Sequence, residues 1–258
     1  MQKSWKSGLV VGAALIVLAG WAVQGGLGQV AAPPAQPAVK AAGENTAIVP
    51  VSRPEEWWNK RHESMNERVR QGNVDLIFIG DSITHGWEGA GKEVWAERYA
   101  KRNAVNLGIS GDRTQHVLWR LDHGNIDGIQ PKVAVVMIGT NNSNKEDHTV
   151  AQIAEGVTAI VKKLREKLPE TKILLLGIFP RGAEPNNQRG KILQVNQILN
   201  KLADGRHVWF IDFGYKFVDA KGNIPKDIMP DYLHLTKEGY QIWADSIEGK
   251  LAELMGEK

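Results

Sequence analysis

The chain has 258 residues, of which 42% are hydrophobic and 24% are charged, and these ordinary values exclude wholesale disorder and collagen-like repetition. Lys and Arg outnumber Asp and Glu by only 32 to 29, so the surface offers little electrostatic attraction for nucleic acid, and no nucleic-acid partner is expected. Cysteine is absent, which excludes disulfides, thiolate metal sites and a cysteine nucleophile.

Residues 1–32 are predicted to be a targeting segment. Lys3 and Lys6 precede an uncharged apolar run from Gly8 to Val23, and small and polar residues follow it. This order is typical of a signal peptide, although the run is intermediate in length between a signal-peptide core and a membrane span. We therefore expect export to the periplasm or the exterior, with an uncleaved N-terminal membrane tether as the alternative.

Residues 33–54 are predicted to form a linker. Prolines recur among alanines in this part of the chain, at Pro33, Pro34, Pro37, Pro50 and Pro54. Such a composition is typical of an extended and mobile segment. One folded domain is then expected over residues 55–258.

The folded domain shows strands alternating with helices. A polar helix is expected over residues 55–70, and further segments with helical spacing of apolar residues lie between and after the strands. Five short apolar runs predict buried strands, at residues 74–79, 104–107, 133–138, 173–178 and 208–211. Strands that are apolar on both faces predict a parallel sheet covered by helices, which is a three-layer α/β/α sandwich with a five-stranded sheet.

Small and polar residues follow the first three strands and precede the last helix. Ligands of such sheets bind beyond the carboxyl ends of the strands, where these residues would gather. The groups are Gly80, Asp81 and Ser82 after the first strand; Gly108, Ser110, Gly111 and Asp112 after the second; Gly139, Thr140, Asn141 and Asn142 after the third; and Asp231 and His234 before the last helix.

These residue types include the parts of a serine hydrolase. Ser82 is the candidate nucleophile, because it stands at a turn that would expose its hydroxyl group. His234 would accept the serine proton, and Asp231, three residues earlier, would fix the tautomer of the imidazole. The backbone N–H groups of Ser82 and Gly111 and the side-chain amide of Asn141 would bind the developing negative charge.

Each motif is weak when taken alone. A Gly-Asp-Ser tripeptide also occurs in ordinary turns, and Asp-x-x-His also occurs as a helix-capping pair. The conjunction of all four groups at strand ends favours an active site. His85 is interpreted as an exposed polar residue, Trp87 is a candidate for the wall of the substrate cleft, and no metal or other cofactor is expected.

The four groups resemble those of the SGNH, or GDSL, hydrolase superfamily, whose letters fall here on Ser82, Gly111, Asn141 and His234. The resemblance is greatest to the catalytic subunits of intracellular platelet-activating-factor acetylhydrolase, isoform I. It rests on residues 111–121, 131–133, 139–142, 180–182 and 231–236, and it covers about residues 74–254. It implies a flavodoxin-like sheet, no metal, and hydrolysis of short acyl esters, acetate above all, through an acyl-enzyme. Dimerisation in that group favours a homodimer here.

The predicted export segment departs from this resemblance, because the resembled enzymes are cytosolic. An exported enzyme of this type is equally consistent with removal of acetyl groups from polysaccharide, such as xylan, or from sialic-acid-type sugars. The expected partner is therefore a small-molecule or glycan acetyl ester. The alternative from another functional class is a non-catalytic glycan-binding module on a tether, which a missing site residue would favour; none is missing.

Overall fold

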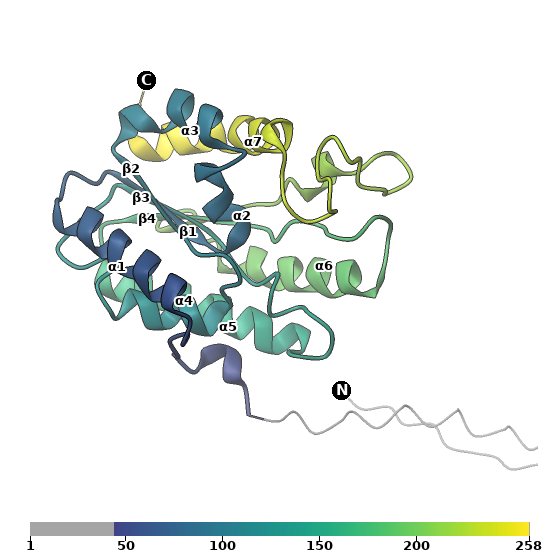
Figure 1. Ribbon diagram of the computed structural model, residues 1–258, viewed down its shortest axis with the longest axis horizontal. Helices are drawn as coiled ribbons and strands as arrows, with labels where there is room; N and C mark the ends of the chain where they lie inside the picture. The colour runs from purple at the N-terminus through teal and green to yellow at the C-terminus, as the bar shows by residue number, and fades with distance from the viewer. Residues whose placement is uncertain (1–43, 258) are drawn as a thin grey trace, which may run out of the picture. The chain divides into compact units, whose positions relative to one another are not determined.

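The computed structural model describes residues 44–257, which form one compact unit (Figure 1). The predicted export segment or anchor, residues 1–32, and residues 33–43 of the predicted linker lie outside the described residues. Within the described part of the chain, no helix has the length and apolar character needed to cross a bilayer.

A parallel sheet of five strands forms the middle layer, in the order β2-β1-β3-β4-β5. The prediction of a five-stranded α/β/α fold is confirmed, and the strand order is the flavodoxin-like one. Each predicted strand has an observed counterpart, and the bounds differ by at most two residues. The strands are β1 (Leu76–Gly80), β2 (Ala104–Gly108), β3 (Val133–Met137), β4 (Lys172–Leu176) and β5 (Val208–Ile211).

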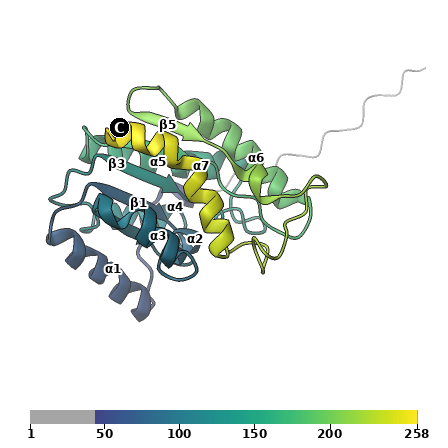
Figure 2. The ribbon, with the colours of Figure 1, turned by 90° about the horizontal axis from the view of Figure 1, so that it is seen from above.

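Helices cover both faces of the sheet, as Figures 1 and 2 show. One face carries α1 (Glu56–Arg70), α4 (Thr114–Leu121), α5 (Val150–Lys167) and α6 (Asn187–Leu199). The other face carries α2 (Ser82–His85), α3 (Lys92–Arg98) and α7 (Lys237–Met255). Short 3-10 turns connect several of these elements, among them η1 (Thr46–Ile48) and η5 (Gly214–Phe217).

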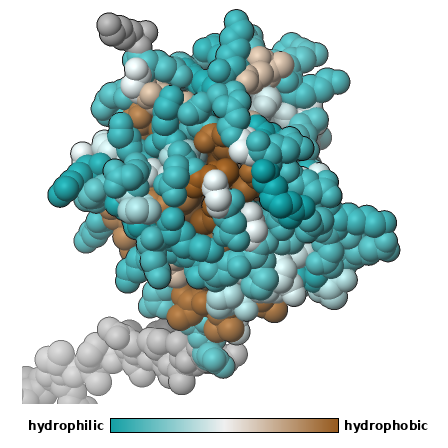
Figure 3. All heavy atoms as spheres, turned by 90° about the vertical axis from the view of Figure 1, so that its left-hand side faces the viewer, coloured by the Kyte–Doolittle hydropathy of each residue, from teal (hydrophilic) through white to brown (hydrophobic). Residues whose placement is uncertain are grey.

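Alternation along the strands divides the core into two apolar clusters. In β1, Ile77 and Ile79 face the α1/α4/α5/α6 layer, whereas Leu76 and Phe78 face the α2/α3/α7 layer. All four side chains are buried, as expected for a strand whose successive side chains point to opposite faces of a covered sheet. The face that Figure 3 shows is mostly hydrophilic, and hydrophobic side chains gather near its centre and at its lower edge.

Residues 44–54, which we call the N-terminal strap, correct the predicted bounds of the linker. Residues 33–54 were expected to be extended and mobile, yet the strap is bound to the domain through α4 and α5. The Thr114 hydroxyl donates to the Ala47 carbonyl (2.7 Å), and the Val51 N–H donates to the Gln115 carbonyl (3.2 Å). Ala47 is fully buried. The proline and alanine composition predicts a mobile segment, but these contacts with residues distant in the sequence hold residues 44–54 against the domain.

Candidate active site

Ser82 stands at the first position of α2, directly beyond the carboxyl end of β1. The preceding residue, Asp81, accepts a hydrogen bond from the Ile83 N–H through its side chain (3.0 Å), which caps this short helix. The turn from strand into helix leaves Ser82 partly exposed, while Asp81 and Ile83 are buried. The local sequence therefore presents one hydroxyl group at the sheet edge.

The loop before α7 brings His234 and Asp231 to the same edge. Asp231 Oδ2 lies 2.6 Å from His234 Nδ1, and Asp231 Oδ1 accepts the backbone N–H of His234 at 2.8 Å. His234 Nε2 in turn lies 2.9 Å from Ser82 Oγ. When Nδ1–H donates to the carboxylate, Nε2 is left to accept the serine hydroxyl proton. The structure thus joins the three residues in one hydrogen-bonded chain.

The carboxyl group of Asp231 is held in its ionised form. Partial burial acts to raise its pKa, but hydrogen bonds from the His234 side chain and backbone outweigh this effect, and the pKa lies below its usual value. An ionised Asp231 can accept the Nδ1–H bond throughout the neutral pH range. The imidazole is therefore held in the tautomer that a general base requires.

A shallow cavity of about 430 Å³ opens beside Ser82 and His234. Its remaining lining residues are His85, Gly86, Glu88, Gly89 and Ser110. The interpretation of His85 as an exposed residue is therefore wrong: it is half-buried, and its Nδ1 lies 2.9 Å from the Ser110 hydroxyl. Burial, followed by the nearby Arg61 charge, lowers its pKa, so the imidazole is neutral.

Trp87 does not line this cavity, contrary to its candidacy as a cleft residue. Its side chain is 1% exposed and packs among aromatic rings between the sheet and α7. The neighbouring rings include Tyr240, at 4.5 Å between centroids, and Trp243, at 5.1 Å. Trp87 is thus part of the hydrophobic core beneath α2.

The other two predicted oxyanion donors lie on two loops at this edge, Gly111 on the loop after β2 and Asn141 on the loop after β3. Ser110 lines the cavity at Ser82, Gly111 follows it, and the carbonyl of Asp112 accepts a bond from Asn141 Nδ2 at 2.9 Å. This bond uses one of the two amide hydrogens of Asn141. The bond from Asn141 to Asp112 thus links the loop after β3 to the loop that carries Gly111, and the oxyanion role of the three donors is a prediction.

Gly111 has a backbone conformation that disfavours a side chain. Its φ is +80°, in the left-handed region, and an added Cβ would lie 2.8 Å from Nη1 of Arg53. Glycine relieves both the backbone strain and this close approach. The loop geometry therefore favours glycine at this position.

A buried polar network supports the loop from behind. Asp112 is fully buried and accepts bonds from Trp58 Nε1 (2.7 Å) and from Nε of the fully buried Arg120 (2.8 Å). Arg120 also donates to Asn125 (2.5 Å). Burial raises the pKa of Asp112 and lowers that of Arg120, and their mutual attraction opposes both effects. We take the two groups to be an ion pair, because each bonds the other directly.

The site includes residues that the motif analysis did not assign. Arg181 donates through Nη1 to the Thr140 carbonyl (3.2 Å) and to Asn144 (3.0 Å), which fixes the loop that carries Asn141. Arg53 lies in the predicted linker with no motif around it, whereas Arg120 and Arg181 fall within residues 111–121 and 180–182, which carry the family resemblance but assign no role to either arginine. Only their partners in space reveal their contribution.

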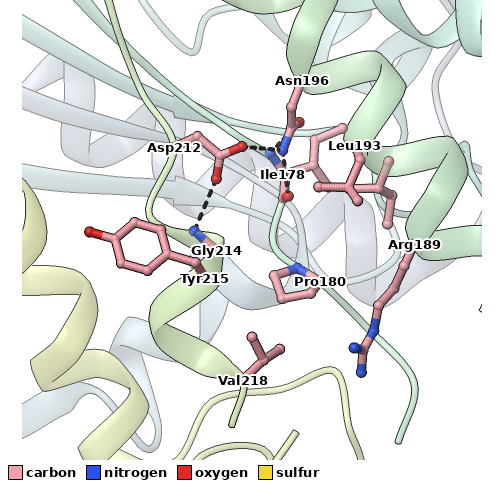
Figure 4. A pocket seen from close by; sticks show the side chains of 10 residues that line it. Ile178, Pro180, Arg189, Leu193, Asn196, Asp212, Gly214, Tyr215 and Val218 are labelled. Atoms are coloured by element: carbon pink, nitrogen blue, oxygen red, sulfur yellow. Dashed lines mark hydrogen bonds between the residues drawn. The ribbon is translucent and has the colours of Figure 1, made fainter. Parts of the chain in front are cut away.

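A second cavity, of about 230 Å³, lies between α6 and the segment after β5 (Figure 4). Aliphatic side chains and Tyr215 line it, and the carboxylate of Asp212 is occupied by bonds from Asn196 (2.9 Å) and the Gly214 N–H (2.9 Å). None of its lining residues lines the cavity at Ser82. We therefore treat the cavity beside Ser82 as the candidate active site.

Comparison with known proteins points to hydrolases. Residues 78–242 match the GDSL-like Lipase/Acylhydrolase family. Platelet-activating factor acetylhydrolase IB subunit alpha1 from Homo sapiens is 36% identical over 201 residues, which cover 78% of this chain and 85% of that protein. The alpha2 subunit from Rattus norvegicus is 39% identical over 184 residues, which cover 71% and 78% of the two chains.

Solved structures share the fold at lower sequence identity. The acetylxylan esterase Axe2 from Geobacillus stearothermophilus has a TM-score of 0.55 and 21% identity, and the match covers 72% of this chain and 96% of that one. A GDSL-like lipase from Bacteroides thetaiotaomicron has a TM-score of 0.61 and 19% identity, with coverage of 75% and 97%. At these identities the comparison shows the shared fold.

Proposed function

This chain belongs to the GDSL-like lipase/acylhydrolase family, and from that premise we propose that it is a serine esterase that hydrolyses acetyl esters through an acyl-enzyme. The family makes the protein an ester hydrolase. The observation that carries the finer proposal is the hydrogen-bonded chain from Ser82 Oγ through His234 to Asp231 beside an open cavity.

In the first half of the reaction, Ser82 Oγ attacks the ester carbonyl carbon as its proton passes to His234 Nε2. The carbonyl oxygen then carries a negative charge in the tetrahedral intermediate. The N–H groups of Ser82 and Gly111 and the amide of Asn141 donate to it. Collapse of the intermediate breaks the bond to the alcohol, which leaves with the proton from His234.

In the second half, water attacks the acetyl-serine ester. His234 accepts a proton from this water, and a second tetrahedral intermediate forms with its oxyanion in the same place. Collapse returns the proton to Ser82 Oγ and releases acetate. The ionised Asp231 stabilises the imidazolium in both halves, because its carboxylate lies 2.6 Å from Nδ1.

The preference for an acetyl group is supported by the relatives, which are named acetylhydrolases, and by the shallow cavity. A carbohydrate acetyl ester is the second candidate, and one observation favours it. The cavity beside Ser82 is lined by Ser82, His85, Gly86, Glu88, Gly89, Ser110 and His234, so no aliphatic side chain offers a surface to a long lipid chain.

We test the proposal with nitrophenyl acetate, butyrate and octanoate, using wild type and Ser82→Ala. The proposal expects the acetate to be cleaved fastest and the variant to fall to background. Acetylated xylan and an acetylated lysophospholipid then compare the two alcohol classes. Wild-type protein that is inert on all three nitrophenyl esters would exclude the esterase proposal and favour a non-catalytic glycan-binding module.

We also propose that the chain is exported, with residues 1–32 as a cleaved signal peptide or a membrane tether, and that it forms a homodimer. The apolar run after Lys3 and Lys6 supports export, and dimerisation in the resembled group supports the dimer. Cell fractionation with N-terminal sequencing tests the first proposal, since a mature chain starting near residue 33 requires cleavage. Sedimentation equilibrium tests the second.

A further inference from the structure

The peptide unit that joins Ser110 to Gly111 has an arginine bound to its carbonyl oxygen. Arg53 Nη1 donates to the Ser110 carbonyl at 2.8 Å and lies 3.6 Å from Asp112 Oδ1. Nη2 of the same guanidinium donates to Glu55 at 2.7 Å, and the group lies over the ring of Trp57. The guanidinium is thus held in place on several sides at once.

The geometry of a trans peptide connects this contact to the oxyanion site. The Ser110 carbonyl and the Gly111 N–H belong to the same planar unit and point in opposite directions. A bond that fixes the carbonyl therefore fixes the direction of the N–H. A cation at the oxygen also polarises the amide, which strengthens its N–H as a donor. Among the described residues, the Gly111 N–H has no acceptor, so it is available to a substrate oxygen.

We propose that Arg53 is a positioning residue for the oxyanion hole, acting through the Ser110–Gly111 peptide. The inference rests on the proposed function, in which the Gly111 N–H binds the oxyanion. Gly111 needs such support because its left-handed backbone carries no side chain that could anchor it. The next residue, Asp112, holds the Asn141 amide through its carbonyl. One guanidinium therefore supports the loop that orients two of the three donors.

Arg53 reaches this loop because the N-terminal strap is bound along the domain. The strap is attached through Ala47 and Val51 to α4, as described above, and through Thr46 Oγ1 to His148 Nε2 at 2.9 Å. Arg53 precedes residues 78–242, which match the family. Support of the oxyanion loop thus comes from a segment outside the matched region.

Arg61 offers a matched control. Its side chain is 16% exposed, against 15% for Arg53, and it donates to a backbone carbonyl, that of Gly108, at the same distance of 2.8 Å. It also pairs with a partly exposed glutamate, Glu88, as Arg53 does with Glu55. The carbonyl of Gly108 shares its peptide unit with the N–H of Ile109, and this N–H donates to the Gly80 carbonyl. Arg61 therefore supports a peptide whose N–H is already bonded within the protein, unlike the N–H of Gly111.

The test measures kcat and KM for nitrophenyl acetate, with thermal melting, in full-length wild type, Arg53→Met and Arg61→Met. Removal of an oxyanion donor typically lowers kcat by about 10²–10³-fold. Loss of its support is expected to lower kcat by about tenfold or more in Arg53→Met, with KM changed by less than about threefold. Arg61→Met is expected to keep kcat within about threefold of wild type.

If Arg53→Met does not fold, kcat and KM are measured on Arg53→Lys in its place. Lysine keeps the cation and one donor but loses the planar fork, so its kcat is expected to lie between wild type and the methionine variant. Equal kcat in Arg53→Met and Arg61→Met, or a change confined to KM, would overturn the positioning role. If the methionine variant is unfolded, a folded Arg53→Lys with the kcat of wild type would also overturn the positioning role. A wild-type protein without esterase activity would instead remove the proposed function itself, on which the role depends.

Discussion

His234 Nε2 lies 2.9 Å from Ser82 Oγ, although the two residues are 152 positions apart in the sequence. The contact joins the turn after β1, the first strand, to the loop that precedes α7, the last helix. Both segments lie at the carboxyl edge of the sheet, where a parallel fold gathers its site residues. The proton transfer that we propose from Ser82 to His234 would then require no rearrangement of the backbone.

Ser82→Ala is predicted to abolish esterase activity without unfolding the protein. Loss of the nucleophile is expected to lower kcat for nitrophenyl acetate by at least about 10⁴-fold. Among residues 44–257, the hydroxyl is bonded only to the His234 side chain, so the melting temperature should change little. The control is Ser64→Ala on the exposed side of α1, which should retain wild-type kcat. Residual activity of the Ser82 variant near the wild-type level would contradict the assignment.

Most of the fold could be predicted from the sequence. Strands buried on both faces produce continuous apolar runs, which is why residues 74–79 and 133–138 were placed within two residues of β1 and β3. The candidate site could be predicted for a related reason: polar residues that follow such runs share one sheet edge. Ser82, Asp231 and His234 do meet there, and their catalytic roles remain predictions.

The parts that could not be predicted depend on contacts between distant segments. The proline-rich composition of residues 33–54 indicates an extended linker, and nothing local shows that Ala47 and Arg53 have partners on α4 and the oxyanion loop. His85 was misjudged for a similar reason. Its position three residues after Ser82 suggests a side chain that points away from the site. However, Ser110 on the loop after β2 lies within hydrogen-bond distance of His85, and both residues line the cavity beside Ser82.

Asn141→Ala is predicted to weaken stabilisation of the oxyanion. The variant removes one donor, so kcat for nitrophenyl acetate is expected to fall by about 10²–10³-fold while KM stays nearly constant. Asn200→Ala is the control, because Asn200 is an exposed residue at the C-terminal end of α6 and should leave kcat unchanged. Steady-state kinetics on both variants provide the measurement. A loss expressed only in KM would show that Asn141 binds the substrate rather than the transition state.

Arg120→Met is predicted to destabilise the fold strongly. It leaves the fully buried carboxylate of Asp112 without its cation, and removal of one partner of a buried pair typically costs about 3–5 kcal/mol. Urea unfolding measures the change in free energy. The matched comparison is Lys163→Met, which breaks a partly exposed ion pair with Asp122 and should cost no more than about 1 kcal/mol. Similar losses in the two variants would argue against an ionised pair at Asp112 and Arg120.

Asp81 is predicted to make stability fall as pH rises. Burial raises its pKa to about 7, and its Oδ2 has no hydrogen-bond partner among the described residues. Between its ordinary pKa and about pH 7, the folded state therefore binds more protons than the unfolded state. Stability decreases with pH over this window, and the decrease is complete above about pH 7.

Asp81→Asn removes this titration while keeping the side-chain oxygen that caps Ile83. Relative to wild type, the variant should therefore be more stable at pH 8 than at pH 5 by about 3 kcal/mol, because about two pH units of the window lie between the two measurements at 1.4 kcal/mol per unit. Urea unfolding at the two pH values measures the difference. Ser64→Ala, which removes no titratable group from an exposed position of α1, should show no such dependence. A difference between Asp81→Asn and wild type that is equal at both pH values would mean that Asp81 is ionised throughout this range.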